Sequence, residues 1–267
     1  MKKSISYVVF AIFLITTVVQ DCQSQILYTE GFAWSYDTAK RFHGSISPSF
    51  NFQTPKENFI QFMNNADLSI HLGKRELKLA NSFQLIKSGS DVILSGGYLY
   101  AKFVSSYQKA VKPEVFVQYQ WREARGIEEK YATGINLRIR FHRSQTAGIY
   151  YGVGGFYEYE LWNYDGVPEE QLPADLSPVT NRLFKINSYF SLKWRPVKTL
   201  NFDLGLYYQS RYDDLDRPRL GCHLNLEYQI TKNLALGINV QTLYDYSPVV
   251  PVDPWNHVVL QQFRISF

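Results

Sequence analysis

Apolar and polar residues alternate along most of the chain after residue 40. In "KYATGINLRIRF" (130–141), Tyr131, Ile135 and Leu137 belong to one face, whereas Lys130 and Arg138 belong to the other. An exact period of two predicts a β-strand with one apolar and one polar side. The same division recurs at 199–211, 219–230 and 233–245.

The alternating segments are long. Many extend over roughly 11 to 15 residues, whereas strands in globular proteins centre near 5 or 6. A tilted strand that crosses a membrane needs about 9 to 11 residues in the hydrocarbon. We therefore predict an all-β, antiparallel, up-and-down transmembrane barrel of about twelve strands. The predicted strands are 41–53, 58–72, 76–87, 92–106, 113–124, 129–142, 146–161, 181–194, 199–212, 218–230, 232–245 and 256–267.

Composition agrees with a membrane barrel. The chain has 20 Tyr, 18 Phe and 5 Trp, and its mean hydropathy is only −0.24. A transmembrane barrel hides its apolar face in alternation and carries aromatic residues near its strand ends. A secreted β-sandwich is the alternative, but it would have shorter strands and more frequent turns. Gly96 and Gly97 predict a bulge in the fourth strand.

The first 24 residues have the layout of a cleaved signal peptide. Lys2 and Lys3 precede an apolar run from Tyr7 to Val19, and the small residues Cys22 and Ser24 precede Gln25. An uncleaved anchor is the alternative, although the run is shorter than the roughly 20 residues that a spanning helix needs. We predict a signal peptide at 1–24, an N-terminal segment at 25–40 and a barrel at 41–267.

The last strand ends on Phe267, which resembles the C-terminal aromatic of outer-membrane proteins. We expect it to serve as an assembly signal for the barrel-assembly machinery. The predicted loops alternate in length, with short turns such as "HRSQT" on one side and the long loops 163–180 and 246–255 on the other. This asymmetry is typical of outer-membrane barrels of Gram-negative bacteria, whose turns are periplasmic and whose loops are extracellular.

Charge and cysteine content exclude several classes. The formal charge of +4 falls to +3 once Lys2, Lys3 and Asp21 leave with the signal peptide. This bias is too weak to predict a nucleic-acid partner. The mature chain keeps a single cysteine, Cys222, and so has no internal disulfide.

Several segments resemble a known family. "EVFVQYQ" (114–120), "YEYE" (157–160) and "LYYQ" (206–209) carry the resemblance within a match over roughly 40–267. The chain resembles the domain-of-unknown-function 481 family, some members of which are called salt-induced outer-membrane proteins. The resemblance implies a barrel in the cell envelope and brings no activity and no site residues.

The polar faces of the strands supply the candidate functional residues. On a barrel they face the lumen, where charges of both signs line a channel or lock it shut. The predicted lumen set is Lys130, Arg138, Arg140, Glu158, Glu160, Lys185, Lys193, Asp203, Arg211, Arg219 and Glu227, with Tyr150, Tyr189 and Tyr207 among them.

Glu158 and Glu160 have a spacing that is compatible with catalysis. They share a face roughly 6.8 Å apart along the strand, which is within the range of an inverting glycosidase. The alternative is a structural pair neutralised by basic residues on neighbouring strands. No catalytic motif or metal-ligand spacing occurs elsewhere, so we expect no cofactor and no metal.

Turn geometry predicts a register for the central strands. A turn at "HRSQT" (142–146) places Phe141 opposite Ala147 and Lys130 opposite Glu158, and the next connection places Glu158 opposite Lys185. Glu158 would then lie between two lysines, which favours its ionised form. Glycines 148, 152 and 154 would leave room for Arg138, Arg140 and Tyr189.

Three functions remain open. The first is a narrow porin-like channel for small solutes. The second is a closed structural or interaction barrel that presents loops 163–180 and 246–255 to an extracellular partner. The third is an envelope enzyme that uses Glu158 and Glu160. In each case the barrel's constant partner is outer-membrane lipid.

Overall fold

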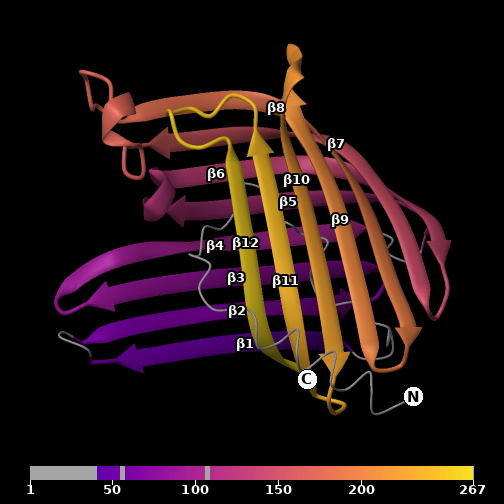
Figure 1. The fold of residues 1–267 in the computed structure, drawn as a ribbon. Helices are drawn as coiled ribbons and strands as arrows, with labels where there is room; N and C mark the ends of the chain where they lie inside the picture. Colours follow the sequence, from indigo (N-terminus) through magenta and orange to yellow (C-terminus); the bar gives the residue numbers. More distant parts are fainter. Residues whose placement is uncertain (1–40, 55–57, 106–108, 267) are drawn as a thin grey trace.

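A computed structural model describes residues 41–54, 58–105 and 109–266. The predicted signal peptide, the segment 25–40 and Phe267 lie outside these residues. Twelve antiparallel strands form a closed barrel in which each strand pairs with its neighbours in sequence and β1 pairs with β12. Strands β1–β6 cross behind β8–β12 at a steep angle (Figure 1). The predicted fold class is confirmed.

The strand bounds follow the alternation closely. They are β1 (Phe42–Gln53), β2 (Phe59–Leu72), β3 (Arg75–Ser88), β4 (Asp91–Ser105), β5 (Val111–Arg122), β6 (Ile127–Arg143), β7 (Ala147–Trp162), β8 (Val179–Val197), β9 (Leu200–Arg211), β10 (Asp214–Gln229), β11 (Leu234–Asp245) and β12 (Trp255–Ser266). In the described part of the chain, two short 3-10 helices, η2 (Glu123–Arg125) and η3 (Glu169–Gln171), lie in connections. Among the described residues, no helix is long and apolar enough to cross a membrane.

The two ends of the barrel differ. We call the end with the short turns the inner end and the end with the long connections the outer end. Residues 163–178 and 246–254, which join β7 to β8 and β11 to β12, both lie at the outer end. The inner end has tight turns such as Gly73–Lys74. The asymmetry predicted from connection lengths is therefore present in the fold.

The apolar face of each strand points outward. Ile135 on β6 is 65% exposed, and Phe184 and Leu206 are also exposed. On β5–β7 the outward aromatics gather near the outer end, where the Tyr119 ring lies 5.6 Å from Trp121 and 4.9 Å from Tyr131. Bands of this kind occur where barrel strands leave the hydrocarbon.

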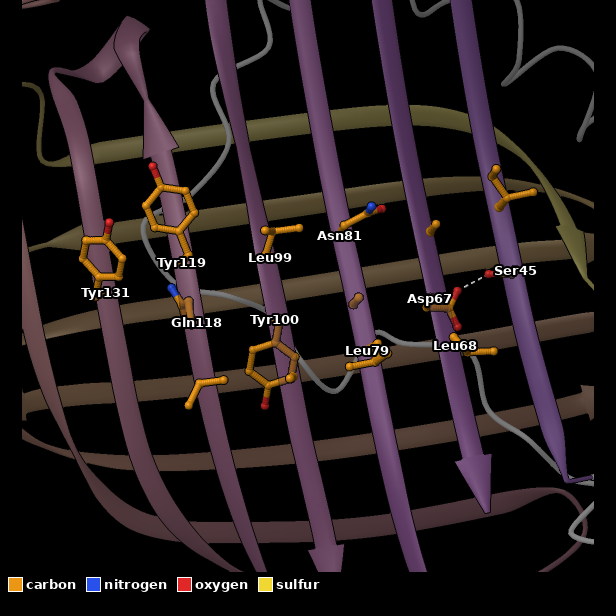
Figure 2. A pocket seen from close by; sticks show the side chains of 15 residues that line it. Ser45, Asp67, Leu68, Leu79, Asn81, Leu99, Tyr100, Gln118, Tyr119 and Tyr131 are labelled. Carbon is orange, nitrogen blue, oxygen red and sulfur yellow. Dashed lines mark hydrogen bonds between the residues drawn. The ribbon is translucent and has the colours of Figure 1, made fainter. Parts of the chain in front are cut away.

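An apolar groove of about 680 Å³ runs across the outward face of β1–β6. Figure 2 shows Asn81, Leu99, Tyr119 and Tyr131 in one row, and the strand register pairs them in that order. Leu79 and Leu68 form part of the next row. Tyr100 and Gln118 line both this groove and the central lumen cavity described below.

The predicted bulge in β4 is misplaced. Gly96 and Gly97 pair regularly with Gln84 and Phe83, and the irregularity lies near residues 92–94 instead. Gly97 is needed for space, because a Cβ there would lie 2.5 Å from the Ser82 carbonyl oxygen and 2.7 Å from the Trp121 ring. Close packing of an aromatic ring explains this glycine, and a backbone irregularity does not.

The predicted register between β6 and β7 is wrong by two residues. Lys130 faces Glu160, and Arg138 faces Gly152. The connection closes more tightly than predicted, with the Ser144 amide donating to the Ala147 carbonyl, and a bulge between Arg140 and His142 takes up Phe141. A shift of two residues keeps every side chain on its predicted face.

Candidate functional site: the charged lumen

Six charged residues form a network across the outer half of the lumen, and we call it the outer network. It consists of Lys130 (β6), Glu158 and Glu160 (β7), Lys185 (β8), Arg219 (β10) and Asp245 (β11). All six are at least nine-tenths buried. The alternation of β6–β11 points these side chains inward, where the barrel wall screens them from the surroundings.

The two glutamates are held by three basic residues. Lys130 Nζ lies 2.6 Å from Glu158 Oε2 and 3.0 Å from Glu160 Oε1. Lys185 also donates to Glu158. The predicted position of Glu158 between two lysines therefore holds despite the register error, because long side chains reach diagonal neighbours as well as facing ones. The residue that directly faces Glu158 on β8 is Leu183, and not Lys185 as predicted.

Arg219 joins the two sides of the lumen. Its Nη1 lies 3.4 Å from Glu158 Oε1 and 3.2 Å from Glu160 Oε1, while its Nε donates to Asp245 at 2.9 Å. β10 and β7 are separated in the sheet by β8 and β9. The guanidinium group therefore crosses the interior and links strands that share no backbone hydrogen bonds.

A second cluster fills the inner half of the lumen. Glu114 (β5) lies 3.4 Å from Lys102 (β4) and 3.7 Å from Arg138 (β6), and it accepts a hydrogen bond of 3.1 Å from the Tyr189 hydroxyl (β8). The Arg138 guanidinium lies 4.1 Å from the centre of the Tyr150 ring. This cluster also joins strands that are not neighbours in the sheet.

Glycines admit these large side chains. A Cβ at Gly152 would lie 2.1 Å from the Tyr189 ring, and one at Gly148 would lie 2.8 Å from the Tyr150 ring. At Gly154 a Cβ would meet Asn136. The predicted role of Gly152 beside Tyr189 is confirmed, whereas Gly148 and Gly154 make room for Tyr150 and Asn136 instead of the two arginines.

The remaining predicted lumen residues separate into three groups. Lys193 and Asp203 pair at 3.0 Å near the inner end, and Glu227 pairs with Arg264 at 2.7 Å. Arg140 is partly buried at the inner end of β6. Arg211 is exposed at the outer end of β9, where it binds Asp213 at 2.7 Å and does not join the outer network.

Several buried charged residues are absent from the predicted lumen set. Besides Asp245, they include Lys102, Lys112, Glu114, Arg122 and Arg125. The alternation in "VKPEVFVQYQ" already separates Lys112 and Glu114 from the outward valines. Alternation could not identify Arg125 as buried, because this residue lies in the 3-10 helix η2 and not in a strand.

The outer end is covered by packed connections, which we call the outer cap. Ile127 (β6) and Trp162 (β7) are fully buried against Val250 and Val252 from the β11–β12 connection. Arg125 Nη2 donates to the Asp253 carbonyl at 2.8 Å. Because β6–β7 and β11–β12 lie on opposite sides of the ring, this connection spans the mouth of the barrel (Figure 1).

Backbone geometry fixes the other half of the outer cap. Gly126 has φ +75°, and a Cβ there would lie 2.6 Å from the Asn163 carbonyl oxygen. The Asn163 amide donates to the Gly126 carbonyl at 2.8 Å. Only glycine adopts this left-handed conformation without strain in so close an approach, so η2 and the β7–β8 connection are joined directly.

A small cavity lies in the central lumen of the described residues. It has a volume of about 30 Å³ and lies beside Lys130, Glu158, Tyr100 and Phe156. A space of this size holds one or two water molecules. Within residues 41–54, 58–105 and 109–266, no group of three His, Cys, Asp or Glu side chains could hold a metal ion.

Comparisons with known proteins leave the family open. No protein-family model and no curated protein matches the chain. The resemblance to the domain-of-unknown-function 481 family therefore stays a prediction.

Solved structures with a similar fold include outer-membrane porins. The NanC porin has a TM-score of 0.42 and 9% identity, covering 84% of this chain and 97% of its own. The KdgM porin, in complex with disordered oligogalacturonate, has a TM-score of 0.41 and 8% identity, covering 84% and 96%. The CymD monoaromatic hydrocarbon channel has a TM-score of 0.40 and 8% identity, covering 85% and 78%. At these values the likeness identifies no solute for this chain.

Proposed function

We propose that this chain is an outer-membrane protein that passes small polar solutes through a narrow lumen, and that the conformation described here is closed. The barrel interior carries this proposal. Among the described residues, nine basic and seven acidic ones are buried inside the barrel or beneath its outer cap. Stability alone does not require these charges, because well-packed apolar residues are often as stabilising as buried ion pairs, or more so.

The outward surface supports a location in the outer membrane of a Gram-negative bacterium. Apolar residues and an aromatic band cover it, as at Ile135, Phe184 and Tyr131. The predicted signal peptide supports export, and the predicted role of Phe267 supports insertion by the barrel-assembly machinery. Fractionation of the mature protein with the outer membrane, with heat-modifiable mobility on gels, tests this location, and recovery from the soluble periplasm would contradict it.

Opening requires two changes in the described conformation. The β11–β12 connection has to leave the cluster that contains Trp162 and Ile127, and Arg219 has to release Glu158 and Glu160. Both involve side chains and a connection, whereas the strand ladders stay intact. Such rearrangements are of the kind that opens and closes loops on microsecond to millisecond timescales.

Single-channel recording in planar bilayers tests the proposal. We compare the wild type with Val250→Ser/Val252→Ser, which weakens the outer cap, and with Val259→Ser, an outward position on β12, as the control. We expect brief openings in the wild type and longer ones in the cap variant, with the control unchanged. If no variant conducts, including one in which residues 247–253 are replaced by a short Gly-Ser linker, the channel proposal fails.

A closed barrel that presents loops 163–180 and 246–255 to an extracellular partner is the second candidate. The small central cavity and the apolar packing of the outer cap favour it. It predicts no conductance in any variant, together with a partner that is lost when these loops are trimmed.

The geometry does not favour an enzyme that uses Glu158 and Glu160. Both carboxylates are bound by basic side chains, and a glycosidase needs space between its carboxyl groups for a sugar and a water molecule. The bonds to Lys130, Lys185 and Arg219 support the structural interpretation of this pair. We therefore do not propose catalysis by Glu158 and Glu160.

A further inference from the structure

A basic cavity opens at the inner end of the barrel, below the ion pairs of the lumen. It has a volume of about 400 Å³ and lies between the β8–β9 turn, the β10–β11 turn and the end of β12. Its basic lining residues are Arg195, Lys198, Lys232 and Arg264. The two turns, "RPVKTLN" (195–201) and "QITKNLA" (229–235), contain no acidic residue. We call this cavity the inner vestibule.

The acidic residues of the inner vestibule are already neutralised. Asp203 Oδ1 lies 3.0 Å from Lys193 Nζ, and Glu227 Oε1 lies 2.7 Å from Arg264 Nη1. Lys193 pairs with Asp203 but does not line the cavity. With Lys193 included, the described residues around the cavity supply five basic and two acidic groups, which is an excess of three positive charges. A cleft lined by one sign of charge concentrates ions of the opposite sign.

The basic side chains of the inner vestibule differ in how they are held. Arg195 is fixed, because its Nε donates to the Asn201 side-chain oxygen at 2.8 Å. Lys198 and Lys232 are exposed on separate turns, and no carboxylate of the described residues lies within salt-bridge distance of either. The Gln229 side chain holds the second turn by donating to the Thr231 carbonyl at 2.7 Å. Flexible lysines on ordered turns can approach one ligand from two sides.

We infer that the inner vestibule binds small multivalent anions bearing carboxylate or phosphate groups and selects them for the lumen. Two or more anionic groups are needed to engage Lys198 and Lys232 together, since these residues lie on different turns. The inference rests on the proposed channel function for its transport part, although binding alone can occur without conduction.

Ion selectivity tests the transport part. The reversal potential is measured across a KCl gradient for the wild type, for Lys198→Glu/Lys232→Glu, and for the control Lys74→Glu/Arg143→Glu. The control residues lie at the same end, outside the cavity, and the control changes the net charge equally. We expect an anion-selective wild type and control, and a loss or reversal of selectivity in the vestibule variant. Equal shifts in both variants would overturn the inference, because they would reflect net charge alone.

Equilibrium binding separates this inference from the channel proposal. Citrate is titrated calorimetrically into each protein in a zwitterionic detergent. We expect affinity to fall about tenfold in the vestibule variant, with little change in the control, because two nearby favourable charges become repulsive. If the wild type does not conduct but binds citrate in this way, the channel proposal fails and the site stands. If the wild type conducts but citrate binding is absent or equal in all three proteins, the site fails and the channel stands.

Discussion

We call the sheet formed by β6, β7 and β8 the wall. The wall and the junction between β1 and β12 differ in how many backbone pairs join their strands. Every residue of β7 from Ala147 to Trp162 has a partner on β8. Among the described residues, β1 and β12 pair only at Ser45–Ser266 and Ile46–Ile265. Beyond these pairs the two strands diverge from a common corner (Figure 1). The barrel is therefore closed, but unevenly.

Side chains reinforce the same difference. The wall carries the glutamates and lysines of the outer network, and its glycines admit Tyr150 and Tyr189. At the junction, Pro48 lacks an N–H group and cannot donate to a strand on either side. Prolines within sheets favour edges, strand starts and bulges for this reason. The outer network and the hydrogen bonds of the strand ladders therefore stabilise the same half of the barrel.

Removing Arg219 gives the largest expected effect. Arg219→Ala leaves Glu158, Glu160 and Asp245 buried with less positive charge, and breaking a buried pair in this way costs about 3–5 kcal/mol. Urea unfolding in liposomes measures the loss. Arg211→Ala is the control, because its pair with Asp213 is exposed to solvent, which screens the attraction, and so contributes little to stability. Equal losses for the two variants would show that the outer network does not stabilise the wall.

The second largest loss of stability is expected from overpacking at a glycine of the wall. Gly152→Ala forces a Cβ into the Tyr189 ring, and overpacking of this kind costs about 1–3 kcal/mol. Gly155→Ala, three residues along β7, meets its nearest atom only at 3.4 Å and is expected to be close to neutral. The same unfolding titration separates the two. A neutral Gly152→Ala would mean that Tyr189 moves freely and that the wall is less rigid than described.

Disulfide formation compares the two regions directly in a Cys222→Ser background. Thr133→Cys with Tyr157→Cys faces across the wall on the outward side and is expected to cross-link readily. Ser49→Cys with Gln262→Cys continues the register of the junction and is expected to cross-link slowly or not at all, since no ladder extends there. Rapid cross-linking of the second pair would show that the junction closes along its full length.

Changing Pro48 gives the smallest effect. Pro48→Ala restores an N–H donor on an edge that has no partner strand at this position. We expect a change within about 0.5 kcal/mol in the unfolding titration, as for substitutions away from packed features. A clear gain in stability, accompanied by cross-linking of Ser49→Cys with Gln262→Cys, would identify Pro48 as the residue that keeps the junction apart.

The strands, their faces and the asymmetry of the two ends were predictable from the amino-acid sequence. Alternation fixes which side chains point inward, because a strand has a period of two and its outward face must be apolar. This placed Glu158, Lys130 and Arg219 inside the barrel without any knowledge of their contacts. A register error of two residues left this placement unchanged.

The contacts between inward residues could not be predicted from the sequence, because they depend on how the closed barrel brings distant strands together. The bulge that takes up Phe141 set the register, so that Lys130 faces Glu160. Closure of the ring brought Arg219 on β10 to the glutamates of β7, and Val250 to Trp162. Contacts across a lumen depend on the curvature and cross-section of the closed sheet, and a pattern that describes one strand at a time contains neither.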